Sequence, residues 1–275
     1  MAKYDMYEMI KPNSNPKKIK IKRLSKKLFI SILVIISIAV LCAVYWFYFM
    51  KPSIENAKES KAISSIIKKV KIERTEENKD KTDMQLKVSE LQKNYNNVVA
   101  WIRIDNTNID YPVMQTTDNN YYLTHSYNNE KSKLGSIYMN KKVDVNLPST
   151  NFVVYGHNIT TGVMFNELLN YRNKDYYNEH KIIKFVTPNL DREYEIISVF
   201  MSRIFYENEE NAFRYYSFIN ATNEAEYNEF VRRAKESSIY DTGVTAKYGD
   251  QLLTLITCEY SSDNGRMVVI AREKK

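Results

Sequence analysis

The chain has 275 residues, with 40 Lys or Arg against 33 Asp or Glu, and its net charge of +7 could suggest a nucleic-acid partner. The charge is concentrated at one end: residues 1–51 hold ten basic and two acidic residues, a net of +8, so residues 52–275 sum to −1. Phosphate binding needs a basic surface, which the larger part of the chain lacks. We therefore expect no nucleic-acid partner.

An uncharged apolar stretch covers residues 28–50. As a helix that rises about 1.5 Å per residue, it is long enough to cross a hydrocarbon core of about 30 Å. Basic residues precede it and Lys51 follows it, so the positive-inside rule predicts a cytoplasmic basic segment over 1–27, a transmembrane anchor over 28–50 and an extracytoplasmic remainder. The alternative is a cleavable signal peptide, but bulky aromatics from Tyr45 to Phe49 end the stretch where cleavage requires small residues.

Residues 52–94 are polar, with apolar residues at helical spacing that predict two helices. The first has Ile63, Ile66, Ile67 and Val70 on one face and is interpreted as a membrane-proximal stalk. The second has Met84, Val88, Leu91 and Tyr95 and should pack on the domain that follows. We thus expect a stalk or linker over 51–83 and one extracytoplasmic domain over 84–275.

From residue 98 the pattern changes to short β-strands separated by turn residues. The strands are predicted over 99–104, 109–113, 136–139, 152–155, 182–186, 194–200, 252–257 and 267–272. Eight such strands predict a mainly β, barrel-like domain with helices. A polar stretch between the sixth and seventh strands, with Ala225, Phe230, Val231 and Ala234, predicts a helix capped by Asn223 or Thr222 that lies on the barrel wall near the final hairpin.

The last two strands bring a thiol and a guanidinium together. Thr254-Leu255-Ile256-Thr257-Cys258 ends one strand, a turn-like stretch follows, and Arg266 begins the next. The resulting hairpin should place Cys258 opposite Arg266. Cys42 lies in the apolar stretch, so Cys258 is the one cysteine outside it, and either a reactive thiol or a buried small hydrophobic residue would explain it.

Of three histidines, His157 alone ends a β run, after Gly156. A histidine there can project into a cleft, and imidazole is a common general acid and base near neutral pH. The alternative is a solvated loop residue, which is how we interpret His125 and His180. No spacing typical of a zinc or calcium site occurs, so we expect no metal and no cofactor.

These pieces together resemble the sortase family of cysteine transpeptidases. The resemblance rests on Tyr111-Pro112-Val113-Met114-Gln115, Tyr155-Gly156-His157-Asn158, Thr254-Leu255-Ile256-Thr257-Cys258 and Arg266 with its β run. It covers residues 86–272 approximately, and the order His, Cys, Arg is that of the family. The helix-bearing insertion and the N-terminal helices are similar to class B members.

The resemblance implies an eight-stranded sortase barrel with catalytic His157, Cys258 and Arg266. Cys258 would attack a peptide carbonyl and form a thioester, with His157 as acid and base and Arg266 stabilising the oxyanion. The partners implied are exported proteins with a C-terminal sorting signal, and peptidoglycan or its lipid-linked precursor as the amine acceptor. The class B resemblance further assigns substrate contacts to Asn119, Leu123, Tyr155, Thr257 and Glu259. For Leu123 and Tyr155 the alternative is core packing, and for Thr257 an ordinary strand position.

Two other functions stay open on the residues alone. A cell-wall cysteine peptidase would use the same thiol but release a free acid. A non-catalytic surface barrel would keep Cys258 in its core.

Overall fold

The computed structural model describes residues 25–275, and the chain divides into two compact units at Lys51/Pro52. The N-terminal unit holds α1 (Lys26–Tyr45) and the π-helical turn η2 (Trp46–Met50). The next helix, α2 (Lys51–Lys69), belongs to the second unit from Pro52 on. Within residues 25–275, one helix, Lys26–Lys69, is long and apolar enough to cross a membrane, a property that membrane anchors share with signal sequences.

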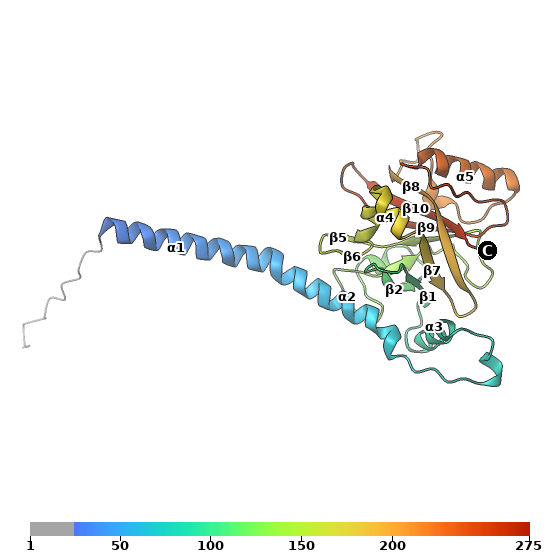
Figure 1. Cartoon of the computed structure of the whole chain (residues 1–275), viewed down its shortest axis with the longest axis horizontal. Helices are drawn as coiled ribbons and strands as arrows, with labels where there is room; N and C mark the ends of the chain where they lie inside the picture. Colours follow the sequence, from blue (N-terminus) through green and yellow to red (C-terminus); the bar gives the residue numbers. More distant parts are fainter. Residues whose placement is uncertain (1–24) are drawn as a thin grey trace, which may run out of the picture. The chain divides into compact units, whose positions relative to one another are not determined.

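Eight strands form a closed barrel in the order β1-β2-β3-β4-β9-β10-β8-β7 (Figure 1). They are β1 (Val98–Arg103), β2 (Asp110–Met114), β3 (Ile137–Met139), β4 (Asn151–Tyr155), β7 (Ile182–Val186), β8 (Asp191–Arg203), β9 (Leu252–Cys258) and β10 (Gly265–Glu273). The predicted eight-stranded barrel is thus confirmed. A further pair, β5 (Asn158–Ile159) and β6 (Val163–Met164), forms a separate two-stranded sheet that the sequence did not predict.

Strand β9 is central to this arrangement because it is buried along almost its whole length. Residues 252–257 are all buried, which requires cover on both faces of the sheet. A continuous run of branched apolar residues suits such a strand. It pairs parallel to β4 on one side and antiparallel to β10 on the other. The position of its last residue, Cys258, is therefore set by two neighbouring strands.

Helices cover the barrel on opposite sides, with α3 at one end of the view and α5 at the other (Figure 1). The predicted α3 (Asp83–Asn94) has a capping box formed by Thr82. The N-cap of α5 (Glu224–Ser237) is Asn223, whose side chain accepts from Glu226 N–H. The shorter helices are α4 (Lys174–Glu179) and the 3₁₀ segments η3 (Glu76–Asn78), η4 (Tyr121–Leu123), η5 (Asn166–Arg172) and η6 (Tyr215–Ser217). Ser198 on β8 donates to Ala234 O, 2.5 Å away, so α5 packs on the barrel wall as expected.

Helix α2 differs from the expected stalk. Ser60, Ile63, Ile66 and Ile67 are buried, and the three isoleucines belong to the hydrophobic clusters formed with barrel residues. The helical spacing predicted the apolar face correctly, but this face packs against the domain rather than along a free stalk. The first part of the segment predicted as a stalk or linker, 51–83, thus contacts the barrel.

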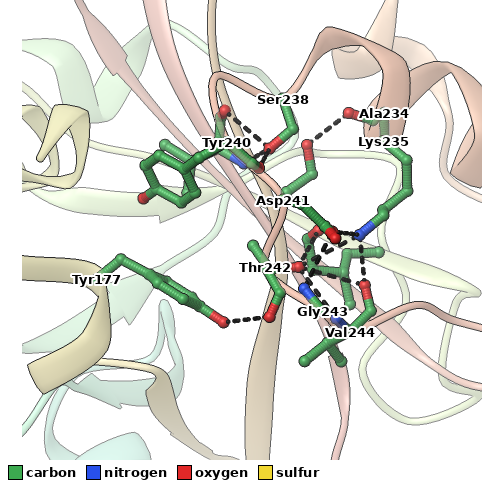
Figure 2. A network of polar contacts seen from close by, with 12 residues as sticks. Tyr177, Ala234, Lys235, Ser238, Tyr240, Asp241, Thr242, Gly243 and Val244 are labelled. Atoms are coloured by element: carbon green, nitrogen blue, oxygen red, sulfur yellow. Dashed lines mark hydrogen bonds and ion pairs between the residues drawn. The ribbon is translucent and has the colours of Figure 1, made fainter. Parts of the chain in front are cut away.

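The connection from α5 to β9 is held by polar contacts over residues 238–244 (Figure 2). Lys235 Nζ binds Asp241 Oδ1 at 3.0 Å and Val244 O at 2.8 Å. Thr242 Oγ1 donates to Ile197 O at 2.8 Å, and Tyr177 OH donates to Thr242 O at 3.1 Å. These bonds tie a long loop to β8 and α4 before it enters β9.

Gly156, directly after β4, has no room for a side chain. A Cβ there would lie 2.4 Å from Ile137 Cδ1 and 2.6 Å from Phe165 Cδ2. Overpacking a filled site costs about 1–3 kcal/mol, so Gly156→Ala should lower the free energy of unfolding by that amount in urea denaturation. Gly162→Ala is the control: its surroundings are open and its φ is +81°, so backbone strain alone, about 1–2 kcal/mol, should act. Wild-type stability of Gly156→Ala would contradict the packing.

Candidate active site

The β9–β10 hairpin pairs Cys258 directly with Arg266. Residues directly opposite in an antiparallel pair point to the same face, with Cβ atoms about 5 Å apart. The loop between them is closed by Glu259 N–H donating to Gly265 O at 3.0 Å. The expectation that thiol and guanidinium face each other across the hairpin is confirmed.

His157 is brought beside Cys258 by the parallel pairing of β4 with β9. Two hydrogen bonds continue this pairing past the end of β4: Thr257 Oγ1 donates to Gly156 O at 2.8 Å, and Asn158 Nδ2 donates to Cys258 O at 2.9 Å. His157 therefore lies between two residues that are each bonded to the end of β9. Its backbone position relative to the thiol is fixed on both sides.

The His157 ring is oriented by a backbone carbonyl. Nε2 lies 2.8 Å from Leu123 O. A carbonyl oxygen can only accept a hydrogen bond, so Nε2 carries a hydrogen in both the neutral and the charged ring. Nδ1 is then the ring nitrogen that this bond leaves available.

The three side chains line one solvent-open cleft of about 230 Å³. Its lining residues are Asn119, Asn120, Leu123, Tyr138, Tyr155, Gly156, His157, Ile204, Ile256, Thr257, Cys258 and Arg266. Four of the five residues expected to contact a substrate are among them. Cys258 is partly exposed, so its thiol is accessible from this cleft and is not sealed in the core.

Two tyrosines form a neutral wall of the cleft. Burial raises the pKa of Tyr138, and the nearby Tyr155 adds to the effect. Burial likewise raises the pKa of Tyr155, whose hydroxyl accepts from Asn140 Nδ2 at 3.0 Å. Both phenols therefore stay protonated at neutral pH and serve as hydrogen-bond donors or apolar surface, not as bases.

Asn119 and Thr257 are engaged in backbone contacts at the cleft. Asn119 Oδ1 accepts from Lys141 N–H at 2.8 Å, a bond that does not use the amide nitrogen of this side chain. Thr257 is buried and its hydroxyl donates to Gly156 O. This bond supports the residue before His157.

Glu259 is the one expected substrate contact that does not line the cleft. Its carboxylate is buried, forms an ion pair with Arg172 and accepts from Ser261 N–H at 3.1 Å. It borders a different, shallow pocket with Met201 and Arg203. Burial alone would raise the pKa of Glu259, but the Ser261 hydrogen bonds and the Arg172 charge outweigh it, and the pKa is lowered.

His125 and His180 lie in connections, as expected, but neither is a solvated loop residue. The His125 ring stacks on Tyr121 with centroids 4.0 Å apart, and its Nδ1 bonds Tyr121 O. His180 is buried, stacks on Tyr176 at 4.1 Å, and bonds Tyr176 O. Within the described part of the chain, no group of three His, Cys, Asp or Glu side chains is placed to hold a metal ion.

Supporting residues escaped the sequence analysis because they act through structure that is not local. Asn158 holds Cys258 O and is itself held by Asn166 Nδ2, which donates to its Oδ1 at 2.6 Å. Arg172 holds Glu259 from the same segment, η5. Asn158 entered the sequence analysis only as the last residue of the run Tyr155-Gly156-His157-Asn158, without a role, and no signal pointed to Asn166 or Arg172.

Comparison with known proteins gives a consistent result. A family model described as Sortase domain matches residues 102–274. Sortase B of Listeria monocytogenes is 32% identical over 182 residues, which cover 66% of this chain and 71% of the relative. Sortase B of Staphylococcus aureus is 29% identical over 184 residues, covering 66% and 72%.

Solved structures of sortase B are also similar to this chain. A crystal structure of sortase B from B. anthracis matches with a TM-score of 0.67 and 29% identity, covering 80% of this chain and 97% of the other. A Staphylococcus aureus sortase B–substrate complex matches with a TM-score of 0.67 and 25% identity, covering 82% and 99%.

The Glu259–Arg172 pair predicts a pH dependence of stability. Because the folded pKa of Glu259 is lowered, its contribution is fully present above the unfolded pKa of about 4.3 and is lost as pH falls through the folded pKa. Glu259→Gln should therefore be less stable than wild type above pH ~5, and the difference should shrink in acid. Urea denaturation from pH 3 to 7 measures this, with exposed Glu210→Gln as the control for losing one charge. A difference that stays constant with pH would contradict the pairing.

Proposed function

This chain belongs to the sortase family, as a class B-like cysteine transpeptidase that processes sorting signals, and we propose that Cys258, His157 and Arg266 carry out its reaction. The observation that supports this most strongly is the single open cleft that all three line. A core cysteine in a non-catalytic barrel would have no such access.

In the first step we propose that the Cys258 thiolate attacks the carbonyl carbon of the scissile peptide bond. A carbon–sulfur bond forms, and Arg266 stabilises the negative charge on the carbonyl oxygen. The carbon–nitrogen bond then breaks as His157 Nδ1 gives its proton to the leaving amine. The products are a thioester on Cys258 and the released C-terminal part of the sorting signal.

In the second step an amine attacks the thioester. Its proton passes to His157 Nδ1, the Cys258 thiolate leaves, and a new amide bond forms. The proposed acceptor is peptidoglycan or its lipid-linked precursor. Nδ1 would serve both steps, because Nε2 is bonded to the Leu123 carbonyl.

The sorting signal would lie along the wall formed by Asn119, Leu123 and Tyr155. Asn119 can donate through its amide nitrogen, and Leu123, partly exposed, offers apolar surface. Thr257 borders the same cleft. We propose that Glu259, whose carboxylate is bound to Arg172, serves the substrate indirectly by fixing the loop after Cys258.

The proposed location is the cell membrane. Residues 28–50 would be the anchor, 1–27 the cytoplasmic segment and 84–275 the extracytoplasmic catalytic domain, with 51–83 between them. The support is the apolar helix near the N-terminus and the basic residues that precede it in the sequence.

Cys258→Ala tests the nucleophile. Full-length protein in detergent, incubated with a library of sorting-signal peptides, should gain the mass of an acyl group on the peptide that contains Cys258, whereas the variant should gain none. Cys42→Ser is the matched control and should react like wild type. Adding a peptidoglycan-type amine should give ligated product, because a transpeptidase transfers the acyl group. Cleavage without ligation would instead identify a cysteine peptidase.

Arg266→Lys tests the guanidinium. Lysine keeps the charge but loses the planar, forked donor geometry, and loss of one oxyanion donor typically costs about 10²–10³ in kcat. Arg272→Lys is a control on the same strand, since Arg272 pairs with Glu195 far from the cleft. Steady-state kinetics should show the large loss for the first variant. Equal effects of the two substitutions would remove Arg266 from the mechanism.

A further inference from the structure

Two neighbouring residues of α2, Glu59 and Ser60, each start a series of hydrogen bonds that leads to a segment in contact with His157. We call these two series the first and the second route. Glu59 Oε1 accepts from Ser132 Oγ at 2.5 Å, and Ser60 Oγ lies 2.6 Å from the Tyr111 hydroxyl. Ser60 and Tyr111 are both buried. Both routes start within one turn of α2.

The first route supports the His157 ring. Ser132 N–H donates to Thr124 O at 2.9 Å, and its Oγ accepts from Leu134 N–H at 3.0 Å, so Ser132 closes the loop that carries Leu123. The Leu123 carbonyl is the partner of His157 Nε2. Glu59 thus anchors the loop that sets the direction of the ring.

Gly135 shows how closely this loop packs on the imidazole. A Cβ on Gly135 would lie 2.8 Å from Leu123 O and 3.0 Å from His157 Cδ2, and its φ is +59°. Glycine is the residue that tolerates both the close approach and this backbone conformation. A small shift of the loop would therefore move the ring.

The second route supports the His157 backbone. The Tyr111 hydroxyl accepts from Met164 N–H at 3.1 Å. Met164 pairs with Asn158, and Phe165 N–H donates to His157 O at 3.0 Å. Met164 has a φ of +59°, a conformation that a residue with a side chain keeps only when its surroundings hold it. The buried phenol supplies that support.

We propose that α2 is a positioning element for His157, with Ser60 and Tyr111 as its positioning residues. The link to catalysis rests on the proposed function. Helix α2, which directly follows the apolar stretch in the sequence, then helps to position His157 and is more than a spacer.

Tyr111→Phe removes the hydroxyl that both Ser60 and Met164 use. In full-length protein in detergent, we expect kcat for peptide-to-amine transfer to fall about tenfold with KM unchanged, because His157 is displaced while the cleft remains. Ser60→Ala should give a smaller loss, and the double variant should match Tyr111→Phe, because the two residues share one contact.

Matched controls separate positioning from stability. Tyr227→Phe removes a buried phenol that donates to Asp250 O, on the α5 side of the barrel. Ser65→Ala removes a bond local to α2, from Ser65 Oγ to Ala62 O. Tyr111→Phe and Tyr227→Phe should lower the melting temperature by a similar amount, about 2–4 °C. Of these two variants, only Tyr111→Phe should lower kcat.

A second readout does not depend on transfer activity. The pH dependence of Cys258 alkylation by iodoacetamide, followed by mass spectrometry of the peptide that contains it, reports on the Cys258/His157 pair. Tyr111→Phe should shift this profile by about 0.5 pH unit, and Tyr227→Phe should not. Identical profiles and equal kcat in the two variants would overturn the inference. Wild-type protein without transfer activity would overturn the proposed function, and the alkylation profiles would still decide the inference.

Discussion

The parallel pairing of β4 with β9 is the constraint on which the site depends. It joins residues about a hundred positions apart, from Asn151 against Leu252 to Tyr155 against Ile256. Beyond the paired residues, two side-chain bonds hold the strand ends together: Thr257 Oγ1 donates to Gly156 O, and Asn158 Nδ2 donates to Cys258 O. A shift of one residue in the β4–β9 pairing would turn the thiol to the other face of the sheet relative to β4 and separate it from His157.

This pairing also explains why the two strand ends can hold a reactive group in an open cleft. Both strands are buried along their lengths, so their positions are fixed by packing, while their last residues emerge at the barrel surface. Cys258 and Arg266 lie on one hairpin and are fixed by the ladder itself. His157 follows a strand rather than belonging to one, so it needs added contacts from Leu123 and from Phe165, the residue after β6.

The parts of this site that are local in sequence could be predicted, and the others could not. Turn residues between two apolar β runs sufficed to place Cys258 opposite Arg266, because hairpin pairing is decided within a few residues. The closed strand order was expected through the family resemblance, because strand periodicity does not say which strands are neighbours. Periodicity found the apolar face of α2 but not the surface it packs against, and it gave no indication of a role for Ser60 or Glu59. Glu259 was expected at the substrate through the class B resemblance, but its carboxylate forms an ion pair with Arg172 from the distant η5.

The charge pattern on β8 and β10 distinguishes Arg266 from its neighbours. The other arginines of these strands each have a carboxylate partner: Arg192 binds Glu273, Arg203 binds Glu209 and Arg272 binds Glu195. Arg266 instead donates to the carbonyl of Gly265, 2.7 Å away, and within residues 25–275 no ion pair of Arg266 with a carboxylate is found. A guanidinium without a carboxylate partner can bind another anion. Arg266 lines the cleft, and under the proposed mechanism the negative oxygen of the tetrahedral intermediate would be that anion. A carboxylate beside it would neutralise that field before any substrate arrived. The acidic residue nearest in sequence to Cys258 is Glu259, and its ion pair with Arg172 keeps its negative charge out of the cleft lining.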